Sequence, residues 1–287
     1  MSKQRRQPHG PFKRAKACGG AWLACAALAV LGGALAAGEW EPPAQPKDDR
    51  HWYPEFPGPD EPLPELKNGS FEEAEAPKKG LPPAPLGWAH PDGLTSFWTS
   101  DPAAPERGKF IVLDTDVLEE EAKKRQAAMR AAAEKGEDPP PAPEKSEVGE
   151  ARQYGAIGAT YGVSFYSSKI ACAPKQAYKI SFDYRGPGGA KVWVRGWGPF
   201  RGEERRRWET IVNCRTAGDG WRHFEQAFHP TRRPQSKDKV AYIEVSYLRV
   251  MLYAYWPRGR YAFDNVKIEA ISDEEYERLK ALPAEPK

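Results

Sequence analysis

Nine short segments between residues 109 and 268 have the length and composition of β-strands, and they constrain the fold more than any other feature of this sequence. They cover residues 109–114, 162–166, 177–184, 191–197, 207–214, 221–228, 240–245, 250–256 and 261–268. Gly, Pro and Asp residues, which favour turns, separate most of them. Many short strands joined mainly by turns predict an antiparallel all-β sandwich or barrel, not a fold built from βαβ units.

Two of these segments alternate clearly between apolar and polar residues. In residues 177–184 every second residue is Tyr, Ile or Phe, and the residues between them are Lys, Ser and Asp. In residues 191–197, valines alternate with Trp193, Arg195 and Trp197. Because successive side chains of a strand point to opposite faces, each segment should bury one face in a core and present the other elsewhere.

A helical segment interrupts the strands. Residues 116–135 are rich in Ala, Glu, Lys and Arg, and acidic residues precede basic ones by four positions, which stabilises a helix surface. We expect Asp116 to be the N-cap and residues 117–150 to form a solvated insertion. A helix that binds a partner protein is the alternative. At the other end, Ser272 to Glu275 have capping-box spacing and predict a short helix.

The N-terminus combines six Lys or Arg residues with an apolar stretch over residues 21–37, as in an export signal. We divide the chain into a signal peptide (1–36), a Pro-rich linker (37–66), a β-domain (67–271) and a tail with the short helix (272–287). The protein is then exported and is secreted, periplasmic or at the cell surface. An uncleaved signal would be its one membrane contact.

Removal of the signal changes the charge of the chain. The full sequence has 43 Lys and Arg against 40 Asp and Glu, a formal net charge of +3. The first 36 residues hold six of the basic residues and none of the acidic ones, which leaves 37 basic and 40 acidic residues and a net charge of −3. Nucleic-acid binding, which requires a basic surface, is therefore not expected.

Two cysteines remain beyond the signal, Cys172 and Cys214. A pair of cysteines in an oxidising compartment is a disulfide candidate. Two unbonded thiols buried in separate strands are the alternative, because the sequence does not supply the distance between them.

Several short motifs, taken in order, resemble the galactose-binding-like jelly rolls, and in particular the carbohydrate-binding modules of families four and nine. Residues 68–72 (NGSFE), followed by Gly87-Trp88, are similar to the opening motif of these domains. Residues 261–268 (YAFDNVKI) are similar to their last strand, and residues 177–184 and Gly220-Trp221 to internal segments. The resemblance spans residues 66–271 and implies a jelly-roll β-sandwich.

The resemblance also implies a structural calcium site. Its carboxylates would come from the opening and closing motifs, which are Glu72 and Asp264 here. Ca²⁺ prefers several oxygen ligands, and one carboxylate from each end would tie the ends of the sandwich together. A solvated Glu72 and an Asp264 in a turn or hydrogen-bond network are the alternative.

Sugar binding needs aromatic rings for the apolar face of a pyranose and polar side chains for its hydroxyl groups. The strand segments provide such side chains at period two, so we name one set of ligand-binding candidates. They are Trp193, Arg195, Trp197, Arg249, Tyr253, Tyr255 and Asp183. Packing of the aromatic residues in the sandwich core is the alternative.

Motifs for catalysis are missing from the sequence. It has no nucleophile elbow, P-loop or dinucleotide-binding glycine motif, and no His pair at metal-ligand spacing. We therefore expect a non-catalytic protein that binds a polysaccharide or surface glycan. An envelope-structural module that binds another protein is the second hypothesis. A carbohydrate-active lyase or hydrolase is the third, because its two carboxylates could be far apart in the sequence.

Overall fold

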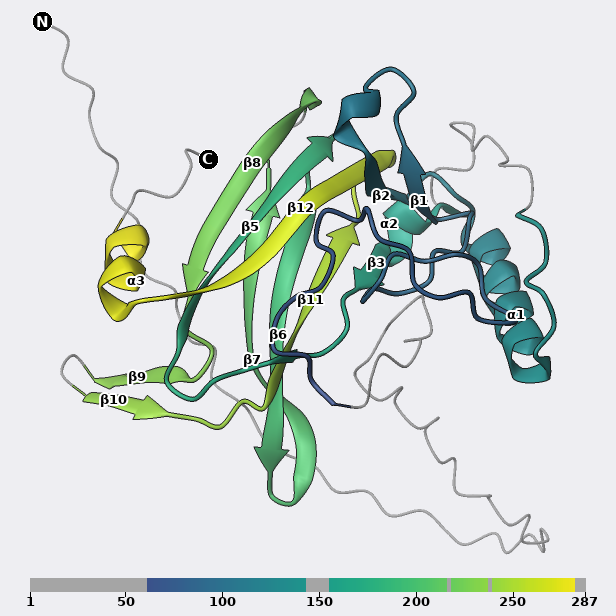
Figure 1. Ribbon diagram of the computed structural model, residues 1–287. Coiled ribbons are helices and arrows are strands. Elements are labelled where there is room, and N and C mark those ends of the chain that lie inside the picture. Colours follow the sequence, from purple (N-terminus) through teal and green to yellow (C-terminus); the bar gives the residue numbers. More distant parts are fainter. Residues whose placement is uncertain (1–60, 143–154, 216–217, 237–238, 282–287) are drawn as a thin grey trace, which may run out of the picture. The chain divides into compact units, whose positions relative to one another are not determined.

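The computed structural model describes residues 61–142, 155–215, 218–236 and 239–281 (Figure 1). The predicted signal peptide, most of the predicted linker, and parts of the insertion and the tail lie outside these residues. Two antiparallel sheets pack against each other within the described part of the chain. The predicted all-β sandwich is confirmed.

Each sheet is built from strands that are distant in sequence. In sheet I the spatial order is β1 (Ser96–Ser100), β2 (Lys109–Asp114), β12 (Arg260–Ile271), β5 (Ala177–Gly186) and β8 (Gly218–Phe228). In sheet II it is β3 (Val163–Tyr166), β11 (Tyr247–Ala254), β6 (Ala190–Phe200) and β7 (Glu203–Cys214), and the short β4 (Ile170–Ala171) also pairs with β11. The chain changes sheet between β2 and β3, β4 and β5, β5 and β6, β7 and β8, and β11 and β12, as in a jelly roll. A separate hairpin joins β9 (Arg232–Ser236) to β10 (Lys239–Tyr242).

The core lies between the two sheets and is formed by one face of each strand. Ile180 and Phe182 of β5 are fully buried, and so are Val192 and Val194 of β6. All four belong to one apolar cluster. The residues between them therefore project from the outer faces of the sandwich, as the alternation predicts.

The opening and closing motifs meet in the structure. Gly69 O accepts a hydrogen bond from Val266 N over 2.8 Å, and a Cβ atom on Gly69 would lie 1.6 Å from Val266 O, so only glycine fits. The Asn68 side chain closes the turn by accepting from Glu73 N over 3.0 Å. Phe71 is fully buried against Trp88, with ring centroids 4.9 Å apart. These motifs thus hold the first and last parts of the domain together.

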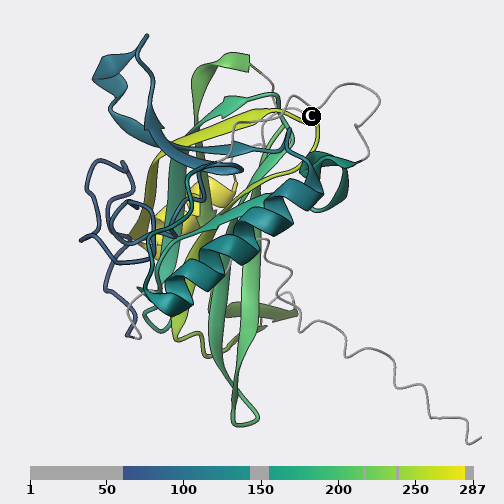
Figure 2. The same cartoon turned by 90° about the vertical axis from the view of Figure 1, so that its right-hand side faces the viewer.

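The insertion helix is docked, which corrects the predicted solvated insertion. α1 (Glu119–Lys135) lies lengthwise along one side of the sandwich (Figure 2) and buries Ala122, Arg125, Met129 and Ala132. Its N-cap is Leu118, so the prediction for Asp116 is wrong.

α1 begins at Glu119, and not directly after Asp116, because contacts with other parts of the chain hold the residues between them. Val117 is buried in the core, and its carbonyl accepts a hydrogen bond from Ile157 N, the first residue of α2 (Ile157–Thr160). These contacts keep the chain extended through Leu118, which pairs with Ala156. Tertiary packing thus overrides the capping preference of Asp116.

The predicted C-terminal helix is confirmed. α3 (Asp273–Lys280) begins after Ser272, whose hydroxyl accepts a hydrogen bond from Glu275 N over 3.1 Å. One further turn of helix, η1 (Pro105–Arg107), precedes β2. None of the described helices is long and apolar enough to cross a membrane.

Of the two alternatives for the cysteines, the structure shows the unbonded one. Cys172 and Cys214 are both buried thiols that are not bonded to each other. Cys214 is the last residue of β7, opposite Ala190, whereas Cys172 follows β4 and lies beside Tyr178. Burial raises the pKa of the Cys172 thiol to about 11, so this residue stays protonated at neutral pH.

Candidate functional site

A row of aromatic and basic side chains covers the outer face of sheet II. β6 contributes Trp193, Arg195 and Trp197, and β11 contributes Tyr247, Arg249, Met251 and Tyr253. The pairing of the strands places Trp197 opposite Tyr247, Arg195 opposite Arg249, and Trp193 opposite Met251. We call these seven side chains the aromatic face. Five of the seven predicted ligand-binding residues belong to it.

Stacked rings mark both ends of the aromatic face. Trp197 and Tyr247 stack with centroids 5.5 Å apart and planes 10° apart. At the other end, Tyr253 stacks on Tyr255, which follows β11, with centroids 6.3 Å apart and planes 12° apart. Between the two stacks, the Arg195 guanidinium lies 4.9 Å from the centre of the Trp193 ring.

The aromatic face differs from the core in both position and exposure. Trp193, Trp197 and Tyr253 do not belong to the core clusters, so the alternative that these rings pack in the core is wrong. They are partly exposed, and Tyr255 is 37% exposed. Tyr247, Arg249 and Met251 are buried. The accessible ring surfaces are therefore those of Trp193, Trp197, Tyr253 and Tyr255.

Polar groups are fixed beside the rings. The Arg195 Nε atom is 3.6 Å from a carboxylate oxygen of Glu209, on the neighbouring β7. The Tyr253 hydroxyl donates to the Tyr161 carbonyl over 2.8 Å. Burial, followed by the neighbouring Tyr255, raises the pKa of Tyr253 to about 12, which keeps the hydroxyl protonated as a donor.

Sequence reasoning missed Tyr247 and Glu209. Tyr247 lies two residues before Arg249 on the same face, so extending the alternation of β11 towards its start would have found it. Glu209 belongs to a different strand, and its position opposite Arg195 depends on the pairing of β6 with β7. The short turn at Arg201-Gly202 indicates that the two strands pair, but the register shift at Gly196/Trp197, which decides the residue opposite Arg195, has no local signal in the sequence.

Asp183 is not part of this site, which corrects the prediction. It lies on β5 in sheet I and projects from the outer face of that sheet. The Arg107 Nη2 atom is 2.5 Å from one Asp183 oxygen, and His223 Nδ1 is 2.8 Å from the other. Asn265 also donates to Asp183 over 2.9 Å. This carboxylate is held in a local network of its own.

The same network contains Asp264, one of the two predicted calcium ligands. Arg107 Nε donates to Asp264 over 2.8 Å, and Asn265 N donates to its other oxygen over 2.7 Å. Glu72 accepts from Lys109 N over 2.9 Å. Among the described residues, no group of three or more acidic, His or Cys side chains could hold a metal ion. With a guanidinium against Asp264, these residues do not fit a calcium ion as they stand, and calcium binding stays an untested prediction.

The two carboxylates of the network differ in acidity. Burial raises the pKa of Asp264 to about 6, although the positive charge of Arg107 and the Asn265 N–H act in the opposite direction. Burial would also raise the pKa of Asp183, but hydrogen bonds from Asn265, His223 and Arg107 hold it below its usual range. Asp183 thus stays charged to a lower pH than Asp264 does, although both are mostly ionised at neutral pH.

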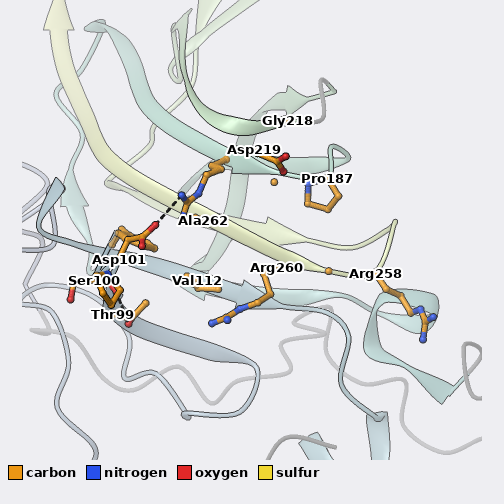
Figure 3. A pocket seen from close by; sticks show the side chains of 15 residues that line it. Thr99, Ser100, Asp101, Val112, Pro187, Gly218, Asp219, Arg258, Arg260 and Ala262 are labelled. Carbon is orange, nitrogen blue, oxygen red and sulfur yellow. Dashed lines mark hydrogen bonds and ion pairs between the residues drawn. The ribbon is translucent and has the colours of Figure 1, made fainter. Parts of the chain in front are cut away.

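A groove of about 800 Å³ lies over the other end of the outer face of sheet I (Figure 3). Its floor includes Phe110, Val112 and Ala262. These three residues form a small apolar cluster separate from the main core, with Phe97 and Trp221 packed against it. The rim is polar and contains several Asp and Arg residues. Sequence analysis did not predict this groove, because its lining comes from five different strands.

Comparison with known proteins identifies no family. No protein-family model and no curated protein matches the chain. Among solved structures, the enzymatically active domain of the bacteriophage CBA120 tailspike protein 4 matches with a TM-score of 0.36 and 12% identity, over 65% of this chain and 20% of its own. A cyclase from Fischerella sp. TAU matches with a TM-score of 0.38 and 16% identity, over 73% of this chain and 96% of its own.

Carbohydrate-binding modules are also among the similar structures. One from family 4, a family named by the motif resemblance, has a TM-score of 0.25 and 14% identity over 42% of this chain and 63% of its own. Modules of families 16, 61 and 11 are similar to parts of the chain as well. This chain thus spans one fifth of the tailspike structure and less than two thirds of the family 4 module. At such identities and TM-scores the functional argument depends on the side chains of this protein.

Proposed function

We propose that this protein is an exported carbohydrate-binding protein without catalytic activity, and that a polysaccharide or surface glycan lies along the aromatic face. The observation that carries the proposal is the row of partly exposed rings, with Trp197 at one end, Trp193 in the middle and Tyr253 with Tyr255 at the other end, and with a guanidinium and a carboxylate beside them. The apolar C–H face of a pyranose packs on such rings, while hydroxyl groups bond to charged side chains.

The length of the row favours an oligosaccharide over a single sugar. Trp197 lies opposite Tyr247, which is six residues before Tyr253 on β11, and six residues cover about 20 Å along a strand. Several linked sugar units would therefore be needed to contact both stacks at once. Arg195 and Glu209, in the middle of the row, would then donate to and accept from the hydroxyl groups of the central units.

Affinity electrophoresis tests the proposal directly. The chain from residue 37 onward should be retarded in gels that contain a neutral polysaccharide it recognises. Trp197→Ala and Tyr253→Ala should each weaken binding about tenfold, since an aromatic contact contributes about 1 kcal/mol or more. Tyr242→Ala is the matched control, because Tyr242 is an exposed ring on β10, away from the aromatic face. No retardation on any plant, algal or bacterial polysaccharide would count against carbohydrate binding.

The non-catalytic part of the proposal has a separate test. Prolonged incubation with each bound polysaccharide should release neither reducing ends nor unsaturated products. Their release would favour the lyase or hydrolase hypothesis. Co-purification of one specific protein, lost when the exposed side of α1 is altered, would favour the envelope-interaction hypothesis instead.

A further inference from the structure

The groove over sheet I carries charged groups that the proposed function does not use. We infer that it is a second ligand site, separate from the aromatic face, and that it binds a sugar acid, a hexuronate unit with its carboxylate on Arg260. The inference does not depend on glycan binding at the aromatic face.

The cation of this site is Arg260, on the central strand β12. Its side chain is 60% exposed, and its guanidinium lies 5.4 Å from the centre of the Phe97 ring. Its Nε atom lies 3.8 Å from a carboxylate oxygen of the buried Asp114, an ion pair that is longer than a hydrogen bond. A ring contact that holds a guanidinium in place while its N–H groups remain available prepares it for a carboxylate ligand.

The other two arginines of the lining are less exposed than Arg260 and lie closer to a carboxylate. Arg185 pairs with Asp101 over 3.2 Å. Arg258 lies 3.3 Å from Asp116, and Figure 3 shows its side chain directed away from Asp101 and Ser100. Arg260 is therefore the lining arginine with the greatest capacity to accept an anion.

The remaining lining favours a hydroxylated ligand over a simple organic acid. Asp101 follows β1 and Asp219 lies on β8, so carboxylates stand at both edges of sheet I, with Arg260 between them. Carboxylates accept hydrogen bonds from hydroxyl groups, which an alkyl or aryl acid does not supply. A neutral sugar, in turn, would leave Arg260 without an anion. A uronate supplies both kinds of group.

The size and floor of the groove agree with this ligand. A volume of about 800 Å³ lies within the range of pockets for small molecules and accommodates one or two sugar units. Val112 and Ala262 provide an apolar floor next to Arg260, against which the C–H face of a pyranose can pack.

Isothermal titration with trigalacturonic acid and with its neutral methyl ester tests the inference on the chain from residue 37 onward. The acid should bind at least tenfold more tightly than the ester, and its affinity should fall with added salt. Arg260→Gln should weaken acid binding at least tenfold. Arg278→Gln is the matched control, because Arg278 lies on α3 outside the groove lining and its side chain is 61% exposed; this variant should leave acid binding within twofold of the wild type.

Equal binding of acid and ester, an unchanged affinity in Arg260→Gln, or no binding of the acid would overturn the inference. Circular dichroism confirms that both variants are folded. Trp197→Ala separates the two sites, because it should weaken neutral polysaccharide binding and leave acid binding unchanged. If Trp197→Ala abolishes acid binding while Arg260→Gln does not, the acid binds at the aromatic face and the groove is not its site.

Discussion

Arg107 controls the electrostatics of sheet I, because one guanidinium contacts two carboxylates and an aromatic ring. It donates to Asp264 and Asp183, and it lies 3.9 Å from the centre of the Trp221 ring. Asp264 is 1% exposed, so its negative charge has little help from water. Without Arg107, a buried carboxylate would lose its counter-charge, which is among the most destabilising changes that a single substitution makes.

The raised pKa of Asp264 makes this contribution depend on pH. A pKa of about 6 in the folded state lies above the unfolded value of about 3.9, so the folded state holds this proton more tightly. The Asp264 contribution to the free energy of unfolding is therefore greatest below pH 4 and falls as the pH rises to about 6. Asp183, whose pKa is lowered, acts in the opposite sense and stabilises the fold above its unfolded pKa.

We predict that Arg107→Met lowers the free energy of unfolding by about 3 to 5 kcal/mol at pH 8 and by clearly less at pH 5. At pH 5 Asp264 is largely protonated, and the missing guanidinium matters less. Urea unfolding at the two pH values measures the difference. In an Asp264→Asn background, the cost of Arg107→Met should vary less with pH. An equal cost at both pH values in the wild-type background would contradict this account.

At the scale of elements, most strands could be predicted because alternation is a local signal. The strands β1 and β9 lack this signal and were not predicted. β1 has the sequence SFWTS, with too few apolar residues to stand out, and β9 contains Pro234. Each is stabilised by the strand beside it. Asp183 shows the corresponding limit for the site. Alternation places it correctly on an outer face, but which of the two sheets it belongs to depends on pairing between distant segments.

The docking of α1 also depends on contacts that the sequence does not reveal. Arg125 is 7% exposed and donates from Nε to the Asp92 carbonyl over 2.9 Å. Its Nη1 atom donates to the carbonyls of Pro140 and Pro141 over 2.5 and 2.9 Å. One side chain thus connects the helix to the loop before β1 and to the Pro-rich segment that follows the helix.

We predict that Arg125→Ala lowers the free energy of unfolding by about 2 to 4 kcal/mol, because it leaves three carbonyl groups without this donor. Arg130→Ala is the control on the same helix. Its side chain is exposed, so the change should be within about 0.5 kcal/mol. Urea unfolding of both variants measures the difference. Similar small losses in the two variants would mean that the helix is not held by Arg125.

At the scale of the whole molecule, the two outer faces of the sandwich have different chemistry. Sheet II presents rings in a row, suited to a long neutral chain, and sheet I presents a groove with an exposed guanidinium. A polymer that carries both neutral and acidic sugars could occupy both faces only by passing around an edge of the sandwich. We expect the variants on each face to act separately, so affinities for mixed polymers would show whether the faces bind one chain together.

A calcium ion and direct hydrogen bonds are two different ways to hold the two ends of the domain together. The motif resemblance assigns this role to a calcium ion on Glu72 and Asp264. In the structure the Gly69–Val266 hydrogen bond joins the ends, and Arg107 and Asn265 already donate to Asp264. A calcium ion at Asp264 would have to displace a guanidinium that also bonds to Asp183. We therefore expect the same melting temperature in 2 mM calcium and in EDTA, on the order of 1 °C apart at most, since a ligand stabilises only the state that binds it. A clear rise with calcium that is lost in Asp264→Asn would reverse this conclusion and establish the calcium site.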